Sequence, residues 1–279
     1  MRKFNWGNFL VALILISGIF MLVYPTIGDY WNSFRSSKAI SGYAENVSSM
    51  SKERYETMLQ EARNYNQMLL TLENEYVLSE EQQALYEQTL DVSGTGIMGY
   101  VEIPAIDCTL PIYHGTKESV LQIAIGHLEW TSLPIGGEGN HSVISGHRGL
   151  KSAKLFTDLD RLAEGDVFMI RVLDEVLTYE VDQIRIVEPH DVSLIEAEPG
   201  KDYCTLLTCT PYGINTQRLL VRGHQIDETM KRNIYIANEA YRVDSLIVMP
   251  IVALPIIAVL MIYVMFAPVK KESLGEDLP

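Results

Sequence analysis

Residues 203–223 read YCTLLTCTPYGINTQRLLVRG, two runs of strand-forming residues on either side of a short turn. Thr, Leu and Tyr dominate the first run, Leu and Val form the centre of the second, and the PYGIN segment between them carries residues that turns favour. The pattern predicts strands over 203–210 and 217–223 that pair with each other. The first run ends close to Cys209, which could be a buried filler, a disulfide partner or a nucleophile.

Five further strands are predicted upstream of this pair, so the region is mainly β. They cover residues 99–104, 108–113, 141–146, 166–172 and 177–189. Two short helices are predicted between them, near 117–126 and 153–161. Short strands with regular turns and few helices are typical of a closed barrel or a sandwich.

The region before the strands is predicted to be helical. Between residues 40 and 90, apolar side chains recur every three or four positions, with polar residues between them and no proline. Ser79, followed by Glu81 and Gln82, marks the start of a new helix. We therefore expect one or two helices here that pack an apolar stripe on the neighbouring body.

Two long apolar segments, residues 6–27 and 245–268, carry no charge. Each is long enough to cross about 30 Å of hydrocarbon as a helix. The nearest basic pairs lie toward the chain ends, at positions 2–3 and 270–271. The positive-inside rule then places both termini in the cytoplasm and residues 28–244 on the extracellular face of the cell membrane. A cleaved signal peptide is the alternative for the first segment, but no small-residue cleavage site follows it directly, so we favour an uncleaved anchor.

The composition and the number of cysteines limit the classes of function that the protein could have. The formal net charge of −14 over 279 residues argues against a nucleic-acid binder, which needs a basic surface to meet phosphates. The cysteines, Cys108, Cys204 and Cys209, all lie in the part placed outside, and an odd count leaves at least one thiol unpaired. Cys204 and Cys209 are predicted to point to opposite faces of one strand, so a bridge between them is not expected. Cys108 is interpreted as a small apolar residue of a strand.

A nucleophilic role for Cys209 needs a positive group nearby, which favours the thiolate and stabilises an oxyanion. Arg218 lies nine residues further on, across the predicted turn. If the two strands pair, Cys209 and Arg218 can lie side by side on one face. Alternation then places Arg222 on that face as well, and Leu219 and Val221 on the other.

The histidines are the candidates for the proton partner of the thiol. They are His114, His127, His141, His147, His190 and His224. Any single histidine is more often structural than catalytic, but His147 stands out because it follows an apolar strand within Ser-Gly-His-Arg-Gly. Glycine on both sides of the His-Arg pair lets the backbone turn sharply and leaves the imidazole exposed. Arg148 could equally be a loop charge.

Other kinds of site fit the sequence poorly. Zinc would need closely spaced pairs such as C-x2-C or H-x3-H, and neither occurs. The glycine-rich segments lack the Lys-Ser/Thr signature and the strand-to-helix context of a phosphate loop. Asp158 and Asp160 are interpreted as a solvated face of a short helix.

Together these residues resemble the sortases, the cysteine transpeptidases of Gram-positive cell surfaces. The segment TLLTC carries the resemblance with a downstream arginine and an upstream Gly-His, and GYVEIPAI, LPIYHGT, NHSVISGHRGL and QRLLVRG match in the right order. The resemblance covers roughly residues 98–226 and is closest to class C, the pilus-polymerising sortases. It implies an eight-stranded sortase β-barrel, a helical N-terminal extension and a C-terminal membrane anchor.

By position, the resemblance implies that Cys209 is the nucleophile, His147 the catalytic histidine and Arg218 the essential arginine. The implied activity is cleavage of an LPxTG-like sorting signal on a secreted precursor through a thioacyl enzyme. A lysine amine of another pilin subunit then resolves that intermediate and polymerises pili, with no cofactor or metal in the scheme. Two alternatives stay open: a sortase that anchors surface proteins to cell-wall precursor, and, more distantly, an inactive assembly scaffold.

The sequence departs from the class C pattern in front of the barrel. Many class C sortases carry an Asp-Pro-aromatic lid tripeptide there, and none occurs between residues 72 and 99. We expect either an open site or one that another residue closes, such as Tyr76 or Tyr86. Gln217 stands where many relatives have a histidine, which we interpret as neutral.

The expected organisation has six parts, and the barrel carries all three residues of the expected site. The parts are an N-terminal membrane anchor or signal peptide (1–27), a helical extracellular region (28–97), the catalytic barrel (98–228), a juxtamembrane linker (229–244), a C-terminal transmembrane helix (245–268) and a cytoplasmic tail (269–279).

Overall fold

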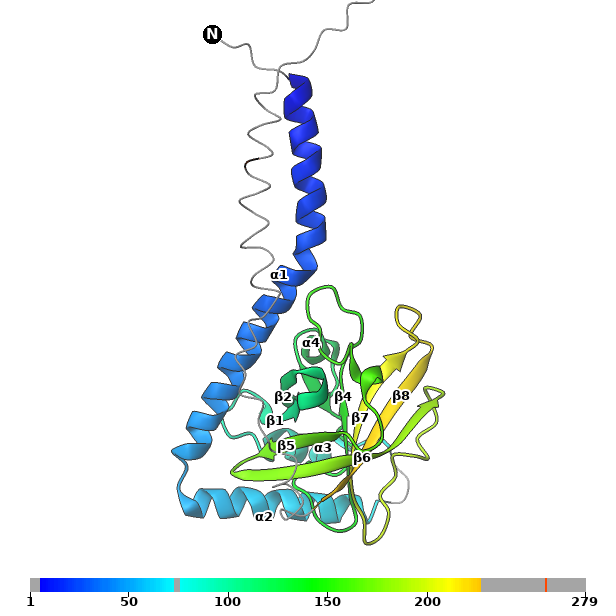
Figure 1. Cartoon of the computed structure of the whole chain (residues 1–279). Coiled ribbons are helices and arrows are strands. Elements are labelled where there is room, and N and C mark those ends of the chain that lie inside the picture. The colour runs from blue at the N-terminus through cyan, green and yellow to red at the C-terminus, as the bar shows by residue number, and fades with distance from the viewer. Residues whose placement is uncertain (1–5, 73–75, 227–258, 260–279) are drawn as a thin grey trace, which may run out of the picture. The chain divides into compact units, whose positions relative to one another are not determined.

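The computed structural model describes residues 6–72, 76–226 and 259 (Figure 1). The first helix, α1 (Trp6–Ser48), begins in one compact unit, which includes the chain up to Thr26, and continues in a second unit that begins at Ile27.

The part of α1 in the first unit is apolar, and most of its large side chains are exposed. Among the described residues, no helix taken alone is long and apolar enough to cross a membrane; Phe9–Met21 and Val23–Ser48, bent by 41° at their junction, pass that test as a pair by length and composition. The predicted segment 245–268 lies outside the described residues apart from residue 259, and so do the predicted linker 229–244 and the tail 269–279.

The second unit contains a closed barrel, as the sequence predicted, with the strand order β1-β2-β3-β4-β7-β8-β6-β5 (Figure 1). The eight strands implied by the family resemblance are present. They are β1 (Ile97–Ile103), β2 (Cys108–His114), β3 (Ile125–His127), β4 (Asn140–Ser145), β5 (Val167–Val172), β6 (Glu175–Val187), β7 (Asp202–Thr210) and β8 (Gln217–Gln225).

The pairing of β4 with β7 matters most for the site. Neighbouring strands are antiparallel except for β2 with β3 and β4 with β7, which are parallel. Parallel strands need a crossover, and here β5 and β6 provide the connection between β4 and β7. Because β4 and β7 run in the same direction, their C-terminal ends lie together, and the loop after β4 starts beside the end of β7.

The stretch 117–126, predicted to be helical, forms only α4 (Glu118–Leu121). The last residues of that stretch belong to β3, the strand that sequence analysis missed. Gly126 of β3 lies so close to Gly115 that an added Cβ atom would come within 2.0 Å of the Gly115 carbonyl oxygen. The segment pairs with both β2 and β4, so tertiary pairing rather than local propensity makes it a strand.

The other strand boundaries lie within two residues of the predicted ones. The stretch 153–161, also predicted to be helical, contains only the 3-10 turn η2 (Leu159–Arg161). A second such turn, η1 (Pro104–Ile106), connects β1 to β2. Both turns are only three residues long, which is the usual length of such connectors.

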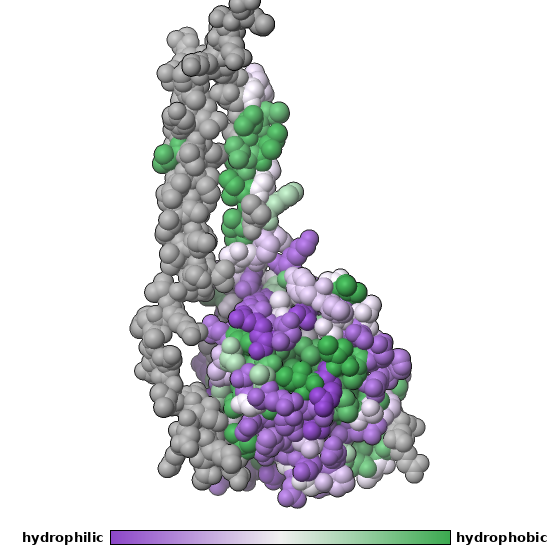
Figure 2. Space-filling model, turned by 45° about the vertical axis from the view of Figure 1, so that its right-hand side comes forward, coloured by the Kyte–Doolittle hydropathy of each residue, from purple (hydrophilic) through white to green (hydrophobic). Residues whose placement is uncertain are grey.

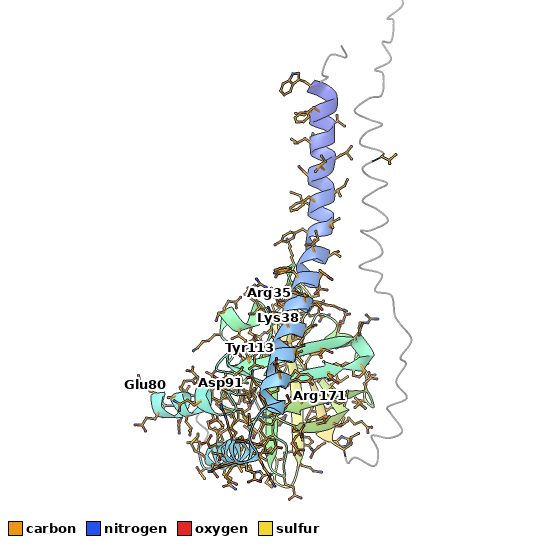
Figure 3. The ribbon with its side chains drawn as sticks, turned by 90° about the vertical axis from the view of Figure 1, so that its left-hand side faces the viewer. Arg35, Lys38, Glu80, Asp91, Tyr113 and Arg171 are labelled. Atoms are coloured by element: carbon orange, nitrogen blue, oxygen red, sulfur yellow. The ribbon has the colours of Figure 1, made fainter. Side chains whose placement is uncertain are left out.

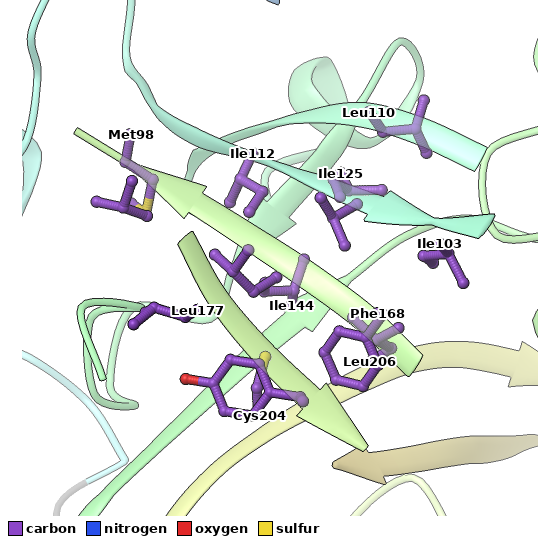
Figure 4. Close-up of a cluster of buried hydrophobic side chains, with 14 of the residues drawn as sticks. Met98, Ile103, Leu110, Ile112, Ile125, Ile144, Phe168, Leu177, Cys204 and Leu206 are labelled. Atoms are coloured by element: carbon purple, nitrogen blue, oxygen red, sulfur yellow. The ribbon is translucent and has the colours of Figure 1, made fainter. Parts of the chain in front are cut away.

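The barrel interior is filled with apolar side chains from all the strands, as the close-up of the core shows (Figure 4). Phe168, Leu206 and Cys204 are completely buried there. Gly223 makes room for this packing, because an added Cβ atom would lie 2.7 Å from a ring carbon of Phe168. Burying one such Phe or Leu side chain contributes roughly 1.5–3 kcal/mol to folding.

The predicted helical region before the barrel contains α2 (Lys52–Leu69) and α3 (Glu80–Gln88) in addition to the end of α1. The predicted start near Ser79 is confirmed, because Ser79 and Gln82 form a capping box. Asn66 of α2 is buried and pairs with the backbone of Leu133 through two hydrogen bonds of 3.2 and 2.7 Å. The helix thus docks on the barrel through a polar pair as well as through its apolar stripe.

Candidate active site

The ends of β7 and β8 bring Cys209 and Arg218 together. The strands are antiparallel, and Cys209 is the register partner of Arg218, as sequence alternation predicted for paired strands. Partners of this kind carry their Cβ atoms about 4.5–5.5 Å apart on one face of the sheet. Both side chains are half-buried, whereas Leu219 and Val221 point into the barrel core. Cys209 and Arg218 therefore lie on the outer face.

β4 brings His147 to the same level. It runs parallel to β7 with Ser145 opposite Leu207, so two residues further along each chain His147 comes level with the cysteine. The Gly146 N–H donates to the Leu207 carbonyl at 3.0 Å, and the Thr208 hydroxyl donates to the Gly146 carbonyl at 2.7 Å. The three candidate residues thus converge at one end of the barrel.

The two glycines that flank His147 and Arg148 have different structural roles. Gly149 has a φ of +78°, a left-handed conformation that favours glycine. Gly146 is required by packing, because an added Cβ atom would lie 2.7 Å from side-chain carbons of Ile125 and Phe156. The sharp turn predicted from the sequence therefore belongs to Gly149, and Gly146 lets two buried side chains close over the backbone.

The His147 side chain retains 26% of its surface exposed and faces one acidic residue. Its Nε2 atom lies 3.4 Å from Oε2 of Glu118, the first residue of α4. A hydrogen bond from Gln122, and then the charge of His147, hold the pKa of the Glu118 carboxyl below its usual range. Sequence analysis did not single out Glu118, because only the neighbourhood of β3 and β4 brings position 118 close to position 147.

The Arg218 guanidinium donates to the backbone at the turn between β7 and β8. Its Nη1 lies 3.1 Å from the carbonyl oxygen of Gln217 and 3.5 Å from that of Asn215. Within the described part of the chain, no hydrogen bond joins the side chains of Cys209, His147 and Arg218. The thiol, the imidazole and the guanidinium therefore lie at the same end of the barrel, but they are not hydrogen-bonded to one another.

The sequence and the fold of this chain both match known proteins. Residues 101–226 match the family model of the sortase domain. The structure is similar to the crystal structure of sortase C1 from Streptococcus agalactiae, with a TM-score of 0.66 and 48% identity over 68% of this chain and 98% of that chain. The chain belongs to the sortase family.

Further relatives refine the position of this sortase within the family. Sortase C from Clostridium perfringens, solved with the C-terminal cell wall sorting motif, is 42% identical with a TM-score of 0.61, over 69% of this chain and 100% of that chain. Sortase A from Streptococcus agalactiae serotype III is 26% identical over 225 residues, which are 79% of this chain and 85% of the relative. The likeness to sortase C structures supports class C, and this sortase is a transpeptidase of that type.

Arg148 of the sortase lies in the loop after β4, as the loop-charge interpretation had it, but most of its side chain is covered. Its side chain is 9% exposed, pairs with Asp160 and donates to the Thr210 hydroxyl at 3.3 Å. Its guanidinium also lies 5.8 Å from the ring centre of Tyr212. Asp160 is exposed, as expected for a solvated face, and its carboxylate also pairs with this arginine. Arg148 thus connects the loop after β4 to η2 through Asp160 and to the end of β7 through Thr210.

Neither of the two tyrosines suggested as substitutes for a lid contacts Cys209 in the described structure. Tyr86 is fully buried, and its hydroxyl lies 3.0 Å from His127 Nδ1 and accepts from the Gly115 N–H at 2.8 Å. Tyr76 packs edge-on against Trp130 at 4.9 Å, and its hydroxyl donates to Glu196 at 3.0 Å. Tyr86 is therefore a core residue, and Tyr76 fastens the segment before α3 to the connection between β6 and β7.

An apolar patch lies on the outer face of the strands that carry the site. It consists of Val143, Ile195 and Leu220 with the partly buried residues Leu128, Trp130, Val187, Val192, Leu194 and Leu207. Leu207 and Leu220 are register partners, two positions before Cys209 and two after Arg218. Apolar side chains also gather on the face turned forward in Figure 2, surrounded by polar ones. This patch packs part of the connection between β6 and β7 onto the outer face of the strands that carry Cys209 and Arg218.

The other two cysteines and two of the histidines, His127 and His141, have buried environments that shift their pKa values. Burial raises the pKa of the Cys108 thiol to about 12 and that of Cys204 well above its ordinary value. Burial lowers the pKa of His127 to about 3, and that of His141 also falls. All three cysteines are free, and no group of three or more potential metal ligands occurs among the described residues. Cys209 is therefore the cysteine placed for chemistry.

Proposed function

We propose that this sortase is a membrane-anchored cysteine transpeptidase that polymerises pili. It cleaves an LPxTG-like sorting signal on a secreted pilin precursor and joins the new carboxyl end to a lysine amine of another pilin subunit. The observation that carries the proposal is the register that sets Cys209 beside Arg218, with His147 level with both. The Clostridium perfringens relative was solved with a cell wall sorting motif, which agrees with this substrate class.

In the first step, the Cys209 thiolate attacks the carbonyl carbon between Thr and Gly of the signal. Arg218 stabilises the negative charge that develops on the carbonyl oxygen. His147 then gives its proton to the leaving amine of glycine, so the C–N bond breaks and a thioester to Cys209 remains. The guanidinium already lies at the turn beside the cysteine, and it needs only to exchange a backbone carbonyl for the oxyanion.

In the second step, a lysine amine replaces glycine as the partner of the thioester. His147, now neutral, accepts a proton from the attacking amine, and the amine nitrogen bonds to the acyl carbon. The thiolate of Cys209 leaves, and an isopeptide bond joins the two subunits. The reacting form carries a thiolate and an imidazolium together, so we expect a bell-shaped dependence of rate on pH.

Membrane attachment at both ends is part of the proposal and is supported by hydropathy. The uncharged segments 6–27 and 245–268 would hold the barrel outside the bilayer, where a precursor retained by its own apolar tail presents its sorting signal. Tethering both partners to one surface raises their effective concentration. Protease treatment of intact and of opened cells tests it: the barrel should be digested in both, and a tag at either terminus only in opened cells.

The experiment that tests the function uses the full-length enzyme and a purified pilin precursor carrying the sorting signal. We expect ladders of covalent multimers that survive boiling in detergent, with the donor carboxyl joined to a lysine side chain when analysed by mass spectrometry. Coupling to cell-wall precursor without multimers would instead favour the anchoring alternative. If the pilin precursor forms no multimers and is not coupled to cell-wall precursor either, the inactive scaffold would be favoured.

A further inference from the structure

The loop that carries His147, residues 147–157, is fixed at its two ends by hydrogen bonds. We call it the His147 loop. The Phe156 N–H donates to the His147 carbonyl at 3.2 Å, and the Gly149 N–H donates to the Thr157 hydroxyl at 3.1 Å. Phe156 is fully buried and packs against Gly146. The two ends of the loop are thus fixed by the barrel, and Ala153 in its middle is buried in the core, whereas Lys151 and Lys154 on either side of it are exposed.

The helix α1 contacts the middle of this loop. Oδ1 of Asp29 accepts a hydrogen bond of 2.7 Å from the backbone N–H of Lys154, which lies two residues before Phe156. One residue earlier on the helix, Gly28 faces the backbone of Ser152, and an added Cβ atom there would lie 3.1 Å from the Ser152 Cα atom. Helix and loop backbones therefore meet at close range, with a side-chain carboxylate in the contact.

The other end of this part of α1 is fixed to the barrel. Tyr43 is 2% exposed, and its hydroxyl donates to the Met98 carbonyl at 3.0 Å and accepts from the Leu173 N–H at 2.7 Å. Asp29 and Tyr43 are fourteen residues apart, so about 21 Å of helix separates the two attachments. Asn32 and Ser36, one and two turns beyond Gly28 on the same face, are buried as well. Figure 3 looks onto this part of α1, where Arg35 and Lys38 are labelled.

We propose that Asp29 is a positioning residue for His147: α1, attached to the barrel at Tyr43, holds the His147 loop through the Lys154 amide and so fixes the imidazole level with Cys209. The inference rests on the catalytic role proposed above for His147. The path is short, because the Lys154 amide is bound by Asp29 and the Phe156 amide by the His147 carbonyl. The imidazole itself has only the exposed Glu118 as a side-chain partner among the described residues, so its position depends on the backbone of this loop.

The first test compares Asp29→Ala with Asp29→Asn in the full-length enzyme. Asparagine keeps an acceptor oxygen for the Lys154 amide and loses only the charge. With a fluorogenic peptide containing Leu-Pro-Glu-Thr-Gly, we expect Asp29→Ala to lower kcat about tenfold or more, since small displacements of a catalytic group are costly. KM should stay within about twofold, because substrate contacts lie elsewhere. Asp29→Asn should retain most of the turnover.

Two further measurements separate positioning from a loss of folding. Amide hydrogen exchange at residues 154–156 should be faster in Asp29→Ala, while the melting temperature and exchange in β7 stay as in the parent enzyme. Gly28→Ala approaches the contact from the helix side: it raises helix propensity but pushes on the Ser152 backbone, so kcat should fall without a fall in melting temperature. Glu45→Ala, an exposed change on the same helix, serves as the control.

The inference is overturned if Asp29→Ala turns over as the parent enzyme does, if Asp29→Asn loses as much as Asp29→Ala, or if the loss of kcat only follows a loss of folded protein. His147→Ala is measured alongside. Full turnover in that variant would remove the proposed role of His147 itself. An inactive His147→Ala together with a fully active Asp29→Ala would remove only the role of Asp29.

Discussion

Two cysteines of β7, five residues apart, show how far the two faces of one strand can differ. Cys204 is completely buried against the barrel core, and burial, followed by the charge of Asp202, raises the pKa of its thiol. Cys209 is half-buried on the outer face opposite Arg218. A slip of one residue in the register would exchange the faces of every side chain. The chemistry proposed for this strand therefore depends on a register that the barrel core fixes.

Two histidines show the same contrast between a buried and a partly exposed side chain. His127 ends β3 with both ring nitrogens engaged: Tyr86 lies 3.0 Å from Nδ1, and Nε2 lies 2.9 Å from the Ser132 carbonyl. Burial lowers its pKa to about 3, so it stays neutral in the folded protein. His147 follows the neighbouring β4 but is partly exposed, with Glu118 as its charged neighbour. In each pair, the buried member stabilises the fold and the outer member is available to a substrate.

The largest expected effect separates the two cysteines. Cys209→Ala should reduce transpeptidation by at least about 10³-fold, because no thioester can form, and leave the melting temperature close to that of the parent. Cys204→Ala should leave kcat within about twofold and lower the free energy of unfolding by about 1–2 kcal/mol, since it creates a small cavity. Multimer formation and urea unfolding measure the two effects.

Thiol labelling checks the same contrast without a substitution. Iodoacetamide on the native enzyme should modify Cys209 alone, and Cys108 and Cys204 only after unfolding, because burial raises their thiol pKa values. Modification of Cys204 ahead of Cys209 would mean that the faces are assigned the wrong way round. No labelling of Cys209 in native enzyme would support the scaffold alternative.

The next largest effect concerns two arginines on the outer face of β8. Arg218→Lys should lower kcat about 10²-fold, since a point charge replaces a planar set of donors at the oxyanion. Arg222→Lys is the matched control four residues away, where the guanidinium binds both carboxylate oxygens of Asp182 at 3.0 and 2.9 Å. That variant should lose stability and keep its kcat. Near-normal turnover in Arg218→Lys would contradict the oxyanion role.

Local alternation was enough to predict the two faces of β7 and β8, and with them the pairing of Cys209 with Arg218. Sequence failed where a structural role depends on a distant partner. β3 is a strand because it pairs with β2 and β4, and the Arg148 side chain is mostly covered where it meets Asp160 and Thr210. Short segments with little local preference take their structure from such contacts.

The buried member of the histidine pair predicts a dependence of stability on pH. The unfolded chain takes up a proton at His127 near its ordinary pKa of 6.5, whereas the folded protein does so only near 3. The unfolded state therefore binds more protons between these values, and stability falls as the pH is lowered through this window. At pH 4.5 the loss should be roughly 3 kcal/mol relative to pH 7.5.

Urea unfolding of the parent and of His127→Gln at pH 7.5, 6.0 and 4.5 isolates this effect. The variant should be less stable at pH 7.5 but lose less on acidification. The difference between the two proteins is needed because Asp202 acts in the opposite sense: burial raises its pKa to about 6, so its protonation stabilises the fold as the pH falls. Equal slopes in parent and variant would show that His127 titrates alike in both states.

The smallest expected effect concerns Glu118, the charged neighbour of His147, which is the partly exposed member of the histidine pair. Its carboxylate is 3.4 Å from His147 Nε2 and its side chain is 68% exposed, so solvent screens the interaction. Glu118→Gln should therefore lower kcat by less than about tenfold, and the loss should shrink further as salt is raised. Lys117→Gln, at the adjacent exposed position, controls for the change in surface charge. A loss of kcat comparable to that of Arg218→Lys, or a loss that does not change with salt, would contradict this expectation. Glu118 would then be an essential partner of His147, and the site would be less open to solvent than the exposure of Glu118 indicates.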